Sequence, residues 1–293
     1  MAKRVVILGA GYAGVEAALK FNKKGRKDDV EIVLIDKNPY HTLLTELHEV
    51  AGNRVGEESI RIPLRDIFRD TRVKVVTDLI TGFDFKGKAL TSETASYPYD
   101  YLVLAIGSSP NYYGIKGLKE HAFPLWSWED AVRIRDHIES CFVRASQEED
   151  EAVRRSLLTF VVIGAGFTGV EMIGELVHWS KKLCKEHGVD RREVRLVNAD
   201  MADMVLPTLG GKNSAKAHRY MEKKGIEVIL GACVQSMDAE AVHFGDSSLS
   251  TRTVIWAAGI RSASEVDETG LPTIGGPRRI KVDAFCRTQE PDV

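Results

Sequence analysis

The sequence lacks paired cysteines. Cys141, Cys184, Cys233 and Cys286 are widely separated, and no two of them stand in a Cys-x-x-Cys or Cys-x-x-x-x-Cys spacing. Such spacings are typical of metal clusters and of redox-active disulfides, so the sequence predicts neither, and it predicts no metal site. Because free cysteine usually packs in the core, we expect all four thiols to be buried and unreactive.

Long apolar runs and a surplus of one charge are also absent. No apolar stretch approaches the roughly 20 residues that a membrane-spanning helix needs. The 40 basic and 42 acidic residues give a net charge of −2, which does not indicate a nucleic-acid partner. The N-terminus runs directly into the apolar stretch Val5–Leu8, which leaves no room for a signal peptide. We therefore expect a cytoplasmic protein, and its 293 residues suffice for about two domains.

One glycine motif occurs twice. GAGYAGVE spans Gly9–Glu16 and GAGFTGVE spans Gly164–Glu171, with six of eight positions identical. Each copy follows an apolar run, at Val5–Leu8 and at Thr159–Ile163, and each leads into a helix-like stretch. In such a turn the first glycine permits the tight bend and the second lets the backbone approach a pyrophosphate. The third lets the helix pack on the strand. Two copies predict two bound dinucleotides.

A second landmark follows both copies. The runs YDYLVLAIG and TRTVIWAAG end in small residues, at nearly the same distance from their glycine motifs. Small residues are needed where the backbone approaches a cofactor closely. The matching offset favours a duplicated α/β architecture of doubly wound parallel sheets. The candidate cofactor-binding residues in these motifs and landmarks are Gly9, Gly11, Tyr12, Ala13, Gly14, Ala105, Gly107, Gly164, Gly166, Phe167, Thr168, Gly169, Ala258 and Gly259.

An acid that binds the adenosine ribose is expected roughly 20 residues after the third glycine. Asp36, at the end of the strand-like run Val30–Asp36, has this spacing in the first copy. In the second copy the run VRLVN ends at Asn198, and Asp200 follows two residues later. Asparagine can bind a ribose hydroxyl, but it lacks the charge that repels a 2′-phosphate. We expect Asn198 to bind the ribose in the second site. We favour NADH as the nucleotide of that site and leave NADPH open.

Each motif ends in a carboxylate, Glu16 or Glu171, in the first turn of its predicted helix. A carboxylate there complements the helix dipole, which is a sufficient role for Glu16. Glu171 belongs to the unit expected to hold nicotinamide, where it could orient the carboxamide or assist proton transfer. Glu171 is therefore the candidate catalytic residue.

The connecting segments carry further signals. Ser127 and Asp130 resemble a capping box at the start of a helix with an apolar stripe from Ala131 to Ala145. The charged stretch 146–156 is expected to be a solvated connection. From about Arg279 the chain is expected to return as a strand of the first sheet.

Several segments together resemble a known family. GAGYAGVEAA, YHTLLTELHEVAG, GAGFTGVEMIGEL and TVIWAAGIR resemble the type II NADH dehydrogenases, the single-chain NADH:quinone oxidoreductases of the respiratory chain. The resemblance covers essentially the whole chain. It implies two Rossmann-like domains, the second inserted in the first. Residues 1–112, rejoined by 279–293, would bind FAD, and residues 113–278 would bind NADH.

The resemblance also implies residue roles. Asp36 and Lys37, with the first three glycines, match the family's contacts to the FAD adenosine. Thr45 and Glu46 fall on the segment that passes the flavin ring, and Glu171 matches the acid near the nicotinamide. Asn198 departs from the family's usual glutamate, which puts a strict NADH preference in doubt.

The C-terminal part departs most from the family. The family continues with a (Tyr/Phe)-Ala-x-Gly-Asp motif that completes the FAD site, a quinone-binding segment and amphipathic helices that dock on the cytoplasmic face of the membrane. These are not found within the 293 residues, so we expect a shortened product with an incomplete FAD domain. The expected partners are a quinone and, through the missing elements, a membrane surface. A homodimer is one alternative for the oligomeric state.

Other interpretations stay open. A ferredoxin or rubredoxin reductase shares the two-nucleotide layout, although the TELHE and GFTGVE segments favour the quinone enzyme. A non-catalytic NADH-binding module is the alternative outside the enzyme class. His41 and His48 are interpreted as packing or surface residues, and Trp256 as a core residue.

Overall fold

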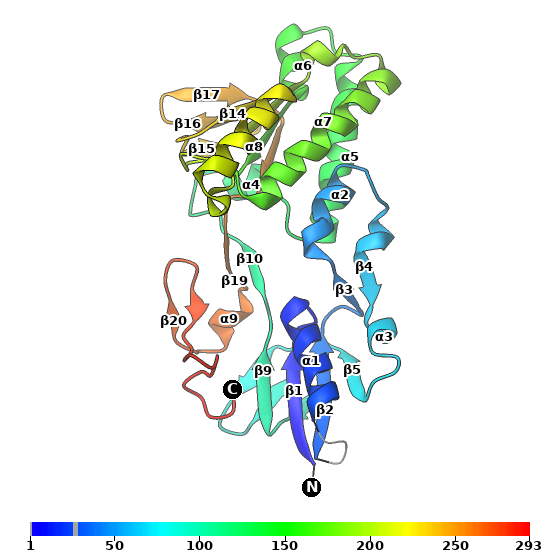
Figure 1. The fold of residues 1–293 in the computed structure, drawn as a ribbon, viewed down its shortest axis with the longest axis vertical. Coiled ribbons are helices and arrows are strands. Elements are labelled where there is room, and N and C mark those ends of the chain that lie inside the picture. Colours follow the sequence, from blue (N-terminus) through cyan, green and yellow to red (C-terminus); the bar gives the residue numbers. More distant parts are fainter. Residues whose placement is uncertain (1, 26–28) are drawn as a thin grey trace. The chain divides into compact units, whose positions relative to one another are not determined.

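The computed structural model describes residues 2–25 and 29–293 and divides into two compact units (Figure 1). Unit 1 comprises Met1–Leu43, Arg61–Ser109 and Ile260–Val293, and unit 2 comprises Leu44–Ile60 and Pro110–Gly259. The second unit is thus inserted in the first along the chain, as predicted. The boundaries differ from the expected 112/113 and 278/279, because residues 44–60 pack with unit 2 and residues 260–278 with unit 1.

Unit 1 is built on a parallel sheet with strand order β5-β2-β1-β9. Its strands are continuous apolar runs, which is typical of parallel strands covered on both faces. Val5 and Ile7 of β1 pack with Ala18 of α1 on one face, whereas Val6 and Leu8 pack with the layer formed by β6, β7 and β8. The elements of unit 1 are β1 (Lys3–Leu8), α1 (Tyr12–Lys24), β2 (Val30–Asp36), β3 (Tyr40–Thr42), β4 (Arg61–Pro63), α3 (Leu64–Ile67), β5 (Val73–Thr77), β6 (Gly82–Asp84), β7 (Ala89–Thr91), β8 (Ser96–Pro98), β9 (Tyr101–Leu104), β10 (Ser108–Pro110), β19 (Ile260–Ser262), α9 (Glu265–Glu268), β20 (Thr273–Ile274) and β21 (Arg279–Ile280).

Unit 2 repeats this plan. Its parallel sheet has the order β11-β18-β12-β13-β14, and a second antiparallel layer, β15-β16-β17, stands between β14 and β18 in the chain. Thus β12, β13 and β18 correspond to β1, β2 and β9. The elements of unit 2 are η1 (Leu44–Glu46), α2 (Leu47–Ala51), η2 (Glu57–Ile60), α4 (Leu118–His121), β11 (Phe123–Pro124), α5 (Trp128–Ala145), α6 (Glu151–Leu157), β12 (Thr159–Ile163), α7 (Phe167–His187), η3 (Arg191–Glu193), β13 (Arg195–Ala199), η4 (Pro207–Leu209), α8 (Gly211–Lys223), β14 (Ile226–Ile229), β15 (Ser236–Met237), β16 (Ala241–Phe244), β17 (Ser247–Ser250) and β18 (Thr253–Trp256).

The predicted capping box begins α5. The Ser127 hydroxyl accepts the Asp130 N–H, and the Asp130 carboxylate accepts the Ser127 N–H, both at 3.1 Å. The predicted apolar stripe of this helix is buried. The charged stretch 146–156, expected to be a solvated connection, contains most of α6 instead. Asp150 starts this helix because its side chain accepts the N–H groups of Ala152 and Val153.

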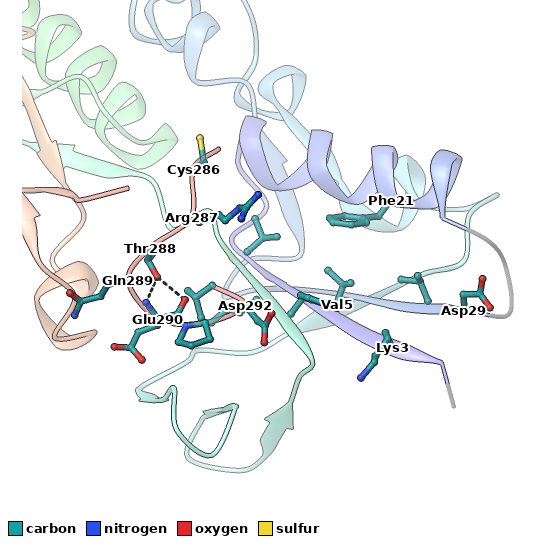
Figure 2. A pocket seen from close by; sticks show the side chains of 16 residues that line it. Lys3, Val5, Phe21, Asp29, Cys286, Arg287, Thr288, Gln289, Glu290 and Asp292 are labelled. Atoms are coloured by element: carbon teal, nitrogen blue, oxygen red, sulfur yellow. Dashed lines mark hydrogen bonds between the residues drawn. The ribbon is translucent and has the colours of Figure 1, made fainter. Parts of the chain in front are cut away.

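The expectation that residues from Arg279 return as a strand of the first sheet is wrong. Arg279–Ile280 form β21, which pairs with β20, and the residues that follow form turns. The Leu102 N–H of β9 donates to the Asp292 carbonyl at 2.9 Å, but no ladder of such bonds follows along the described part of β9. A cavity of about 880 Å³ is lined by residues 286–293 together with residues of β1, β9 and Phe21 of α1 (Figure 2). Among the described residues, the outer edge of β9 therefore makes this one backbone hydrogen bond and pairs with no further strand.

The four cysteines are not all buried. Cys141 and Cys184 are buried, and burial raises the pKa of both thiols. Cys233 and Cys286 are exposed. The prediction of four buried thiols is therefore wrong for these two.

Candidate functional site

The first glycine loop, Gly9–Gly14, joins β1 to α1 and depends on the absence of side chains. Gly9 has φ +104°, and a Cβ atom there would lie 2.2 Å from the Ala105 carbonyl oxygen. A Cβ on Gly14 would lie 1.7 Å from the Gly9 carbonyl oxygen. Neither approach is sterically possible, so the first glycine allows the turn against β9 and the third brings α1 onto that turn.

Gly11 differs from the other two glycines. A Cβ there would meet nothing within 4 Å, although Gly11 is the N-cap of α1. It also provides no side-chain cap to the helix. The side of the loop that faces the helix N-terminus is therefore open, as an approaching phosphate requires. Tyr12 and Ala13, the residues between the glycines, are exposed in this first turn.

Asp36 lies at the end of β2, beside the first loop. One carboxylate oxygen accepts the Ala10 N–H at 2.6 Å, and the other accepts the Asn38 N–H at 2.8 Å. A carboxylate offers about four acceptor positions, so two remain for ribose hydroxyls. A small cavity of about 80 Å³ opens here, within unit 1. Its lining includes Gly9, Asp36, Lys37, Asp78, Ile106 and Glu265.

The second loop, Gly164–Gly169, has the same construction. Gly164 has φ +118°, and a Cβ there would lie 2.7 Å from the Ala257 carbonyl oxygen. A Cβ on Gly169 would lie 1.8 Å from the Gly164 carbonyl oxygen, whereas one on Gly166 would meet nothing within 4 Å. Phe167 and Thr168 are exposed, like their counterparts in the first loop. The repeated sequence therefore produces a repeated geometry.

The landmark residues lie where β9 and β18 end. Ala105 and Ala257 contact the first glycine of their respective loops, as described above. Gly107 has φ +76° and open space around it. Gly259 has φ +156°, and a Cβ there would lie 2.2 Å from the hydroxyl of Tyr113, which donates to the Ala258 carbonyl at 3.5 Å.

The acid of the second loop is Asp200, and the expectation for Asn198 needs correction. The Gly9 N–H donates to the Ile35 carbonyl and the Gly164 N–H donates to the Ala199 carbonyl, so the residues that follow, Asp36 and Asp200, correspond. Asp200 accepts the Ala165 N–H at 2.5 Å and the Ala202 N–H at 2.8 Å, which are the same two kinds of bond.

Asn198 is fully buried in β13. Its side-chain amide donates to the carbonyls of Val162, at 3.1 Å, and Gly164, at 2.9 Å. Its side chain therefore hydrogen-bonds to Gly164, the first glycine of the loop, and is not available to bind a ribose. The sequence analysis placed the end of the strand at Asn198, whereas β13 continues to Ala199, so the carboxylate at the strand end is Asp200.

Thr45 and Glu46 lie in η1, which packs with unit 2. The Thr45 hydroxyl donates to the Glu46 carboxylate at 3.3 Å. The potential ligand atoms of Glu46, His48 and Glu49 lie within 4.8 Å of one another, a grouping that the sequence analysis did not single out. Glu171 lies in the second turn of α7, not in the first turn as predicted, and has a carboxylate oxygen 3.8 Å from His48 Nδ1.

Two of the weaker candidates have structural roles. His41 is buried, and its Nδ1 lies 2.8 Å from the Ala10 carbonyl oxygen. Trp256 is buried, and its indole N–H donates to the Asn111 carbonyl at 3.0 Å. Both fit the packing roles predicted for them.

The comparison with protein families agrees with this geometry. The pyridine nucleotide-disulphide oxidoreductase family matches residues 3–293. The chain belongs to this family. Within it, the chain is 33% identical over 273 residues to a type II NADH:quinone oxidoreductase of Staphylococcus haemolyticus and, over the same length, to one of Staphylococcus aureus. These matches cover 91% of the chain and 67% of each relative. They confirm the resemblance inferred from the motifs.

Several solved structures share the fold of this chain. NDH2 from Plasmodium falciparum, solved in complex with NADH, superposes with a TM-score of 0.87 at 18% identity. The match covers the whole chain but 63% of the Plasmodium protein. A putidaredoxin reductase, solved in covalent complex with putidaredoxin, gives a TM-score of 0.75 at 21% identity. Among the helices of residues 2–25 and 29–293, none has both the length and the apolar character needed to cross a membrane.

The different roles of Asn198 and Asp200 can be tested by stability. Asn198→Asp should lower the free energy of unfolding by roughly 3 kcal/mol or more, because a buried carboxylate would face two carbonyl oxygens with no donor. Asp200→Asn keeps an acceptor for the Ala165 N–H but leaves the Ala202 N–H without one, and should lower the free energy of unfolding by about 1 kcal/mol. Urea denaturation of both variants measures the difference. Equal stability of Asn198→Asp and the unmodified protein would contradict the assignment.

Proposed function

We propose that this chain is a flavin-dependent NADH dehydrogenase that oxidises NADH and transfers the electrons to a quinone. The observation that carries the proposal is the pair of open glycine loops, each with its own carboxylate, Asp36 or Asp200. One dinucleotide would need only one such loop. Membership of the oxidoreductase family and the names of its curated relatives support the same reaction.

Unit 1 is assigned to FAD, which is typical of the family. Gly9 and Gly14 shape the loop, Gly11 leaves space for its pyrophosphate, and Asp36 retains acceptor positions for its ribose. Lys37 lines the same cavity and lies 3.9 Å from Glu265, so its charge is partly balanced. When bound, FAD takes up a hydride from NADH and releases electrons singly or in pairs to an acceptor.

Unit 2 is assigned to NADH. Its loop would bind the pyrophosphate at the N-terminus of α7, and Asp200 would accept hydrogen bonds from the adenosine ribose. The carboxylate would also repel a 2′-phosphate. The position of Asp200 therefore favours NADH over NADPH more strongly than Asn198 did in the sequence analysis.

Glu171 is proposed as the carboxylate near the nicotinamide. Its side chain is 46% exposed in the second turn of α7, two residues after the third glycine of the loop. From there it can orient the carboxamide or exchange a proton with solvent. Thr45 and Glu46 are proposed to lie along the flavin ring. The acceptor is proposed to be a quinone at a membrane surface, and the oligomeric state a homodimer.

A non-catalytic NADH-binding module is the second candidate. One observation favours it: the described edge of β9 makes a single backbone hydrogen bond, to Asp292, and borders a large cavity. An open sheet edge of this kind weakens unit 1 rather than unit 2. In that case unit 2 would bind NADH while unit 1 held FAD poorly.

The absorbance spectrum of the purified chain separates the two candidates. The dehydrogenase predicts a yellow protein with a flavin band near 450 nm, which NADH bleaches without oxygen and a soluble quinone restores. The module predicts a colourless protein that still binds NADH. A yellow protein that NADH does not bleach would contradict the proposed reaction itself.

Asp200→Ala tests the basis of the NADH preference. Loss of the charged acceptor should raise the KM for NADH roughly tenfold and narrow the preference over NADPH by a similar factor. Asp203→Ala, at an exposed acid nearby, is the matched control and should leave both values within about twofold. Steady-state kinetics with the two nucleotides provide the measurement. An unchanged preference in Asp200→Ala would place the discriminating residue elsewhere.

A further inference from the structure

The segment around α2 packs along the start of α7 with a matched spacing of one helical turn. His48 of α2 contacts Glu171 of α7, at 3.8 Å from Nδ1 to the carboxylate. Four residues later in each helix, Gly52 lies against Glu175, where a Cβ on Gly52 would be 2.4 Å from the Glu175 Cβ. Four residues correspond to about one turn, so the two contacts are in register. The position of His48 beside Glu171 is therefore set by the backbone of α2.

Two further features hold this register. Leu47, Val50 and Ala51 of α2 are buried, so the helix is anchored by its apolar face. Arg54, just after α2, is within ion-pair distance of both Glu49 and Glu175, the latter at 3.3 Å. The side chain of Glu175 is mostly buried, which reduces the screening of this ion pair by solvent. These contacts fix the position of α2 and, with it, the position of the His48 imidazole.

The two partners differ in exposure. The His48 side chain is 12% exposed, whereas the Glu171 side chain is 46% exposed. His48 contacts the carboxylate through Oε2, and nearly half of the Glu171 side chain is exposed to solvent. A buried imidazole therefore holds one oxygen of a carboxylate whose other oxygen can meet a ligand.

The surrounding charges make the imidazole necessary. The potential ligand atoms of Glu46, His48 and Glu49 lie within 4.8 Å of one another, so the imidazole has these carboxylates near it as well as that of Glu171. Arg54 forms ion pairs with Glu49 and Glu175. If the ring were removed, Glu171 would lose this neighbour, and the like charges of the carboxylates that remain would repel one another. Glu171 would then turn outward into solvent.

We propose that His48 is a positioning residue for Glu171. It orients the carboxylate at the N-terminus of α7 so that Oε1 faces the nicotinamide end of the second nucleotide. This inference rests on the proposed function, which supplies the nicotinamide. His48 itself touches neither nucleotide and acts through Glu171.

A double-mutant cycle tests the proposal. His48→Ala should slow the reduction of the flavin by NADH about tenfold, while the dissociation constant of NADH stays within about twofold. In a Glu171→Ala background the same substitution should change the rate by less than about twofold, because the residue through which it acts is gone. His48→Asn, which places an amide nitrogen near the position of Nδ1, should recover most of the rate. His178→Ala, at an exposed histidine of α7, is the matched control and should match the unmodified protein.

An equal loss of rate from His48→Ala in both backgrounds would overturn the proposal and indicate a purely structural role. A second measurement does not depend on activity. Glu171→Gln should shift the imidazole ¹⁵N resonances of His48 and leave those of His178 in place; unmoved His48 resonances would overturn the proposal. If the unmodified protein shows no bleaching by NADH, the proposed reaction fails, and the resonance shifts still decide whether His48 and Glu171 are coupled.

Discussion

Both halves of the molecule depend on the contact between the third glycine of a loop and the carbonyl of the first. At Gly14 and at Gly169, a single methyl group would overlap that carbonyl oxygen. The helix can therefore approach the strand end only when this side chain is absent. Its approach directs the N-terminus of the helix toward the open space above Gly11 or Gly166, where a phosphate can bind. The carboxylate at the end of the next strand then completes the loop by accepting an N–H from it.

The two copies diverge in what surrounds this common geometry. In unit 1 the loop lies beside a small cavity with Asp36 and Lys37, and the sheet ends at β9 with little backbone pairing beyond it. In unit 2 the buried Asn198 donates a hydrogen bond to the first glycine of the loop, and Glu171 lies beside His48. Under the proposed function, the first copy would retain FAD, and the second would present a carboxylate next to the nicotinamide of NADH.

The sequence predicted the elements whose signals are local. The bounds of α1 and β2, the capping box of Ser127 and the roles of the three glycines all follow from neighbouring residues. Asn198 was misplaced because strand register is a property of pairing: the bond from Gly164 to Ala199 fixes it, and no spacing within the sequence does. The packing of residues 44–60 with unit 2, and hence the meeting of His48 with Glu171, is likewise long-range. The expected return of the residues after Arg279 to the first sheet was wrong. A short strand pattern does not indicate which strand it pairs with, and Arg279–Ile280 pairs with β20 in a hairpin.

The central claim is that the chain holds two separate dinucleotide sites with different occupants. The direct test is to measure FAD and NADH bound per chain in the unmodified protein, in Gly11→Ala and in Gly166→Ala, since a methyl group at either position fills the phosphate space and clashes with no other part of the protein. The account predicts one FAD and one NADH per chain, with Gly11→Ala losing only FAD and Gly166→Ala losing only NADH. Loss of both nucleotides from either single variant, at unchanged folding stability, would contradict it.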